Sequence, residues 1–71
     1  MGEEWKDKKA EQLYLVAIGN YYDNIRSDAV KSLGKLAREG SSDAAWALGA
    51  IARGNYYDWL RTMAIKELGQ T

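Results

Sequence analysis

The side chains in this sequence that can do chemistry are tyrosines, carboxylates, lysines and serines, because its 71 residues include no histidine and no cysteine. Without those two residue types there is no thiolate nucleophile, no Ser–His pair, and no zinc or iron–sulfur site with the usual ligands. General acid–base catalysis needs a pKa shifted by burial or a charged partner, and no carboxylate pair falls in a predicted cleft. Gly54-Asn55-Tyr56-Tyr57 lacks the lysine and second glycine of a phosphate-binding loop. We therefore expect no enzyme activity, no metal site and no cofactor.

Paired aromatic residues indicate binding rather than catalysis. Tyr21-Tyr22 recurs as Tyr56-Tyr57, and Trp59 follows the second pair. Tyrosine and tryptophan offer a large contact area at low entropic cost, so exposed clusters of them suit protein binding or self-association. Alternatively, one tyrosine of each pair packs over the helix ends and the other is exposed only because the motif repeats. The candidate interaction residues are Tyr21, Tyr22, Tyr56, Tyr57, Trp59 and Trp5.

These pairs belong to an internal repeat with a period of 35 residues. Ten of the sixteen residues from Gly19 to Gly34 are identical to those from Gly54 to Gly69. A period of about 20–50 residues is typical of solenoids, in which each unit is one supersecondary element stacked on the next. We expect one all-α domain over residues 1–71, with repeat one at about 3–38 and repeat two at about 41–71.

Each repeat is predicted to be a helical hairpin. Apolar residues at three- and four-residue spacing, bounded by glycines, predict helices over Glu3–Ile18, Asn24–Arg38, Ser42–Arg53 and Asp58–Gly69. Gly19 is expected to take the left-handed conformation just past a helix end, and Asp23 or Asn24 to cap the helix that follows. Two stacked hairpins form a short α-solenoid; the alternative is a closed four-helix arrangement in which the first helix covers the open end.

Two features of this pattern need an explanation. Leu13–Ile18 has the composition of a strand as much as of a helix. We assign it to a helix that is apolar on all faces, which is typical of burial between neighbours. Gly34 and Gly49 lie inside predicted helices, where glycine costs about 1 kcal/mol relative to alanine. We expect a neighbouring backbone to approach closely at both.

The second helix of each repeat carries a recognisable motif. Asn24–Ala37 follows the pattern Val-Arg-x-x-Ala-x-x-x-Leu-Gly-x-Ile with small variations, and Leu60–Gly69 matches it again. The motif resembles that of short HEAT-like repeats of the phycobilisome-lyase type. The resemblance implies a stacked helical scaffold for partner binding, with Arg26 and Arg61 bridging units by reaching an Asp or Asn of the neighbouring turn. The family seldom carries a Tyr-Tyr pair in its turns.

Composition excludes further classes of function. Ten basic and ten acidic residues leave a net charge near zero, which argues against binding to nucleic acid or to an anionic membrane. The longest uncharged apolar run is far too short to span a bilayer, and the acidic start is unlike a secretory signal peptide. We expect a soluble protein, cytoplasmic if natural. Proline would be absent by chance from only ~3% of such chains, which favours an engineered or idealised sequence.

Two hairpins fall short of the three or more repeats that usually stabilise a solenoid. Apolar residues of the end helices would then lack a cover; they are Trp5, Leu15 and Ile18 at one end and Trp59, Met63 and Ile65 at the other. A homodimer, or a domain swap that exchanges one hairpin, would bury them. We expect a small scaffold or self-associating structural protein, the alternative being a module that binds a protein partner through the Tyr-Tyr/Trp edge.

Overall fold

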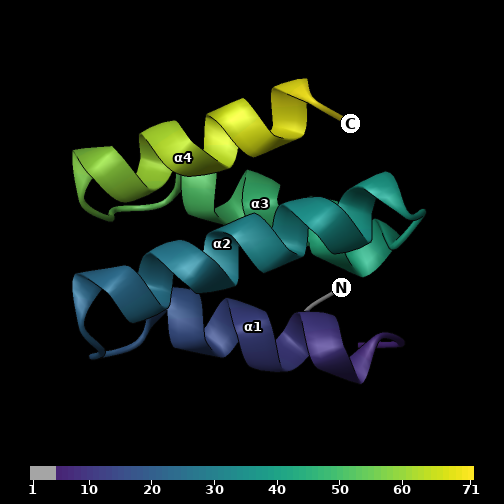
Figure 1. The fold of residues 1–71 in the computed structure, drawn as a ribbon, viewed down its shortest axis with the longest axis horizontal. Coiled ribbons are helices and arrows are strands. Elements are labelled where there is room, and N and C mark those ends of the chain that lie inside the picture. Colours follow the sequence, from purple (N-terminus) through teal and green to yellow (C-terminus); the bar gives the residue numbers. More distant parts are fainter. Residues whose placement is uncertain (1–4) are drawn as a thin grey trace.

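The computed structural model describes residues 5–71, which form four helices. They are α1 (Lys8–Ile18), α2 (Asp23–Arg38), α3 (Ser42–Arg53) and α4 (Asp58–Gly69). The α1–α2 hairpin lies beside the α3–α4 hairpin, so that α1 and α4 are at opposite ends of the stack (Figure 1). Within the described range α2 and α3 each pack against all the other helices, whereas α1 and α4 do not touch. The all-α, two-hairpin prediction is confirmed, and α1 does not cover the open end.

The core lies between the two hairpins and is rich in alanine. Its fully buried members are Ala10, Ala17, Ala29, Val30, Leu33, Ala44, Ala47, Leu48, Ile51, Leu60 and Ala64. Small side chains bring helix axes close together, and the larger ones fill the space between them. The helix assignment of Leu13–Ile18 is confirmed, but its burial on all faces is wrong because Leu15 is 49% exposed. None of the three other described helices covers the outer side of α1.

The start of α1 differs from its predicted position. Residues 5–7 are not helical, and Glu3 lies outside the described residues. Asp7 occupies the N-cap position, where its Oδ1 accepts hydrogen bonds from the backbone N–H groups of Lys9 (3.1 Å) and Ala10 (3.2 Å). The carboxylate satisfies two amides that a helix start leaves without partners, so the helix begins at Lys8.

The starts of α2 and α4 are built alike. Tyr22 and Tyr57 stand at the N-cap positions, and neither makes a side-chain capping bond. The prediction that Asp23 or Asn24 caps α2 is therefore wrong, since Asp23 is already the first helical residue. Acidic residues in a first turn are stabilised by the helix dipole, which accounts for the aspartate at this position in both repeats.

The glycines that follow α1 and α3 have a different role from the predicted one. Gly19 and Gly54 have φ of −84° and −80°, so neither is left-handed. A Cβ atom on Gly19 would lie 2.8 Å from Cε2 of Tyr21, and one on Gly54 would collide with the Tyr56 ring. Both glycines make room for the tyrosine two residues later. Among residues 5–71 the left-handed glycine is Gly40, with φ of 104°, just after α2.

Side chains, rather than neighbouring backbones, lie closest to the glycines within α2 and α3. The Glu67 carboxylate occupies the space where Gly34 would carry a Cβ, and the Arg53 guanidinium lies 2.9 Å from the equivalent point on Gly49. The expectation of a close backbone approach is therefore wrong at Gly49, where only Arg53 side-chain atoms come within 4 Å, and at Gly34 the closest atoms are those of the Glu67 side chain.

Candidate functional site

The two tyrosine pairs lie at the same edge of the molecule. Figure 1 shows the α1–α2 turn and the α3–α4 turn side by side at one end of the hairpins. Tyr21 and Tyr56 fold back over Gly19 and Gly54. Tyr22 and Tyr57 are more exposed, at 80% and 61%. In each pair the first ring packs against a helix end while the second extends from the surface.

Arg26 joins the two turns. Its guanidinium carbon lies 5.1 Å from the centre of the Tyr57 ring and 5.6 Å from that of Trp59. Nη2 also donates to Oδ1 of Asp23 at 2.8 Å, and the arginine side chain is only 14% exposed. Arg26 thus bridges the repeats, as predicted, but through aromatic faces instead of an acidic or amide partner in the next turn. Trp59 consequently belongs to the junction between the hairpins.

The edge carries two open hollows lined by the tyrosines. One, of about 440 Å³, is bounded by Asn20, Tyr21, Tyr22 and Ile25. The other, of about 470 Å³, is bounded by Ile18, Arg26, Asn55, Tyr56 and Tyr57. Both are open to solvent and mix aromatic with amide side chains. Because both are open, neither encloses a ligand in the way that small-molecule sites usually do.

Trp5 does not join the tyrosine edge. Its ring packs against Tyr14 (5.6 Å between centroids) and edge-on against Trp46 (5.4 Å), and these last two also touch. Burial raises the pKa of the Tyr14 phenol, and the nearby Tyr56 phenol raises it further. The cluster holds the segment before α1 against α1 and α3, so Trp5 is a packing residue here.

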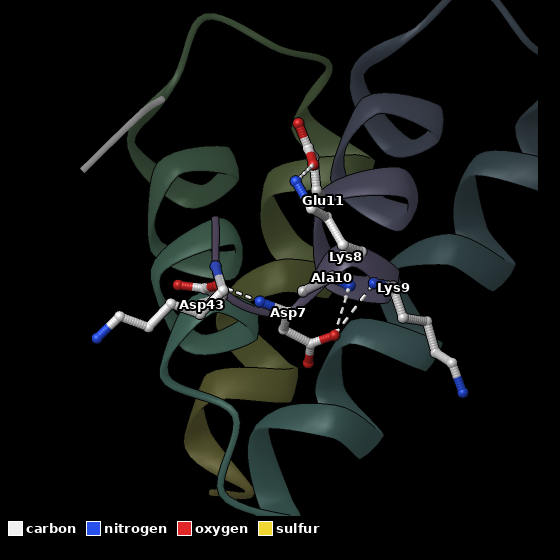
Figure 2. A network of polar contacts seen from close by, with 7 residues as sticks. Asp7, Lys8, Lys9, Ala10, Glu11 and Asp43 are labelled. Atoms are coloured by element: carbon white, nitrogen blue, oxygen red, sulfur yellow. Dashed lines mark hydrogen bonds and ion pairs between the residues drawn. The ribbon is translucent and has the colours of Figure 1, made fainter. Parts of the chain in front are cut away.

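A polar network at the other end of the hairpins was not apparent from the sequence. The Asp43 carboxylate is 3% exposed, and its Oδ2 accepts hydrogen bonds from the backbone N–H groups of Lys6 (2.6 Å) and Asp7 (2.7 Å). Figure 2 shows this contact beside the Asp7 cap of α1. Asp7 and Ser41 are residue types that favour the N-cap position, which is a local signal, but the contact made by Asp43 depends on folding.

Ser41 links the two caps. Its hydroxyl donates to Oδ2 of Asp7 at 2.8 Å and accepts from the backbone N–H of Ala44 at 3.2 Å, which caps α3. The Ser41 hydroxyl and the Ala10 amide hold the pKa of Asp7 below its usual value. A carboxylate stabilised in its ionised form is a poor proton carrier, so the arrangement is suited to holding α1 against α3.

Two further findings concern the described residues as a group. Among residues 5–71 no cluster of three or more acidic side chains is placed to hold a metal ion. In the same range no helix has the length and apolar character needed to cross a membrane.

The outward side of the second hairpin is an uncovered surface. We call it the open face; it consists of Ala52, Asp58, Arg61, Thr62 and Ile65, around a hollow of about 360 Å³. Ile65 is 57% exposed, whereas its repeat equivalent, Val30, is 0% exposed beneath the second hairpin. Arg61 pairs with Asp58 of its own helix and is 40% exposed. Its counterpart Arg26 is instead covered by Tyr57 and Trp59.

Comparison with models of known protein families, with curated proteins and with solved structures finds no match.

Proposed function

We propose that this chain is a small helical-repeat scaffold that self-associates and has no catalytic activity. The observation that carries the proposal is the exposure of Ile65, at 57%, against 0% for Val30 at the same position of the first repeat. Val30 is covered by the second hairpin, and nothing among the described residues covers Ile65 in the same way. The open face therefore repeats a surface type that already forms a helix–helix junction within the molecule.

The energetics favour association through this face. A domain of this size buries a smaller fraction of its surface than a larger one and is marginally stable, and most of its core side chains are alanines. Full burial of an isoleucine side chain contributes about 1.5–3 kcal/mol of favourable free energy. Covering the exposed half of Ile65 in each of two copies would therefore favour association. Dimerisation would also raise the apparent stability by mass action.

Sequence features support the scaffold part of the proposal. The resemblance to HEAT-like repeats implies stacking and partner binding, not chemistry. The near-identical turns and the absence of proline support an engineered or idealised origin.

Light scattering during size-exclusion chromatography tests self-association directly. We expect the mass to rise from that of one chain, 8.0 kDa, towards twice that value as the protein concentration is raised. A mass that stays at one chain over a hundred-fold range of concentration, with ~1 mM at the upper end, contradicts the proposal.

The tyrosine edge supports a second candidate function, the binding of a protein partner. Among the described residues Tyr22 and Tyr57 are the most exposed large hydrophobic side chains, and they line the two open hollows. Selection from a displayed peptide library on the wild type, followed by measurement of the selected peptides on a Tyr22→Ser/Tyr57→Ser variant, tests this edge. Unchanged affinity for the double variant would exclude it.

A further inference from the structure

The two repeats differ non-conservatively at only three of the sixteen aligned positions, and these fall on one side of a helix. The pairs are Asn24/Trp59, Asp28/Met63 and Ser32/Glu67. They are four residues apart, which places them on a single helical face. The first hairpin carries the polar residues Asn24, Asp28 and Ser32 at these positions. The second hairpin carries Trp59, Met63 and Glu67.

In the second hairpin this face packs against α2. Trp59 stacks on Arg26, and the Met63 sulfur accepts a hydrogen bond from Ser27 Oγ at 3.4 Å. Glu67 Oε1 accepts from Arg38 Nη1 at 2.9 Å. Each of the three residues that distinguish α4 from α2 thus contacts the first hairpin.

In the first hairpin the same face is exposed and polar. We call Asn24, Asp28 and Ser32 the outer stripe; all three are solvent-exposed along α2. The opposite end of the stack has kept the residue types of the internal junction: Ile65 corresponds to Val30, Thr62 to Ser27 and Arg61 to Arg26. The outer stripe of α2 is therefore polar and suited to solvent exposure, whereas the open face retains residue types that pack against a helix.

We infer that two copies of this chain pair open face to open face, with α4 antiparallel to α4 of the second copy and a two-fold axis beside Ile65. This inference rests on the proposed self-association and specifies its geometry. A head-to-tail stack would place Ile65 against the outer stripe, where the Asp28 carboxylate stands at the position that Met63 fills in the internal junction. Removing that exposed carboxylate from water beside an apolar side chain is costly. Two-fold pairing places the exposed Ile65 of one copy on that of the other and closes after two copies.

Charge placement agrees with the antiparallel arrangement. With Ile65 near the axis, Arg61 of one copy lies beside the last turn of α4 in the other, where the backbone carbonyls carry partial negative charge. Gly69 in that turn has no side chain, and no atom lies within 4 Å of where its Cβ would be, which leaves room for the guanidinium. The ion pair of Arg61 with Asp58 is exposed, and exposed ion pairs contribute little to stability. Arg61 can therefore leave Asp58 for the last turn of the other α4 at little cost in free energy.

Single-cysteine cross-linking tests the geometry, because the chain has no cysteine of its own. Ile65→Cys under a mild oxidant is expected to give a covalent dimer, since a disulfide forms only between Cα atoms within about 7 Å. Leu15→Cys is the matched control, because Leu15 is also an exposed apolar residue, at 49%, but lies on α1. Leu15→Cys is expected to give no covalent dimer. A mixture of Ile65→Cys with Asp28→Cys is expected to give only the Ile65→Cys homodimer.

Cross-linking between Ile65→Cys and Asp28→Cys would show a head-to-tail stack and overturn the inference. A dimer by light scattering in which Ile65→Cys does not cross-link overturns it as well, and indicates a domain swap or another face.

Charge insertion provides a second readout. Ile65→Glu is expected to weaken dimerisation on the order of 30-fold or more, and Leu15→Glu to leave it unchanged. Circular dichroism checks that both variants fold. If the wild type is monomeric at every concentration, the proposed function itself fails. If Ile65→Glu dimerises like the wild type, the function stands and this geometry is wrong.

Discussion

The buried carboxylate of Asp43, in the first turn of α3, accepts a hydrogen bond from the backbone N–H of Asp7 at 2.7 Å, although the two residues are 36 positions apart. The bond ties the segment before α1 to the second hairpin. It also places Asp7 where its own carboxylate caps α1. The local cap and the long-range contact therefore reinforce one another.

Removal of the Asp43 carboxylate should destabilise the fold. Asp43→Ala leaves the amides of Lys6 and Asp7 without their acceptor, and hydrogen bonds to charged groups contribute about 1.5–3 kcal/mol. We expect a loss of about 2–4 kcal/mol in the free energy of unfolding, measured by urea denaturation. Asp28→Ala is the control, since Asp28 is an exposed residue in α2; an equal loss in both variants would contradict the role given to Asp43.

Stability in acid should depend on Asp7. Hydrogen bonds from Ser41 and the Ala10 amide lower its pKa from the usual 3.8, so its ionised form is favoured more in the folded than in the unfolded chain. Its contribution is fully present above the unfolded pKa and is lost as pH falls through the lower, folded pKa. We expect stability to fall below about pH 4, and to fall less in Asp7→Asn. Parallel urea titrations from neutral to acidic pH measure this difference, and identical slopes would refute it.

The two helical glycines should respond to alanine in opposite ways. Gly49→Ala displaces only the flexible end of Arg53 and should gain about 0.5–1 kcal/mol of helix stability. Gly34→Ala meets the Glu67 carboxylate, which is held by Arg38, so it should destabilise. Thermal melts of the two variants compare them directly, and a shift of the same sign in both would be contrary to expectation.

The two equivalent arginines should differ in their effect on stability. Arg26→Gln loses contacts with Tyr57 and Trp59 in a largely buried site, where cation–π interactions contribute about 1–2 kcal/mol. Arg61→Gln loses only an exposed ion pair, which contributes about 0–1 kcal/mol. Urea denaturation in an Ile65→Glu background removes any contribution from self-association. A larger loss for Arg61→Gln would contradict the role of Arg26 at the junction.

Most helix boundaries were predictable because the sequence signals that set them are local. The predicted ends of all four helices, at Ile18, Arg38, Arg53 and Gly69, agree with the structure. Such boundaries depend on short-range capping, apolar spacing and glycine. The start of α1 was misplaced because the acidic and basic residues before Asp7 suit a helix, and the Asp43 contact that holds Lys6 and Asp7 out of it involves α3.

The tyrosine edge was predictable in position but not in detail. The repeat places both pairs at the same edge, as the structure shows. The sequence does not reveal that Tyr56 packs on Gly54, or that Arg26 lies against the rings of Tyr57 and Trp59. These contacts cross a turn or join two helices, so their geometry exists only after the hairpins have packed.

The sequence alone thus determines an all-α chain of two similar hairpins, because hydrophobic period, caps and the 35-residue repeat are properties of neighbouring residues. Only the tertiary structure decides which of two equivalent surfaces is covered. Val30 and Ile65 are similar side chains in equivalent helices, yet one is 0% and the other 57% exposed. The difference arises because burial depends on what is stacked above a helix, and only the first hairpin has the second one above it.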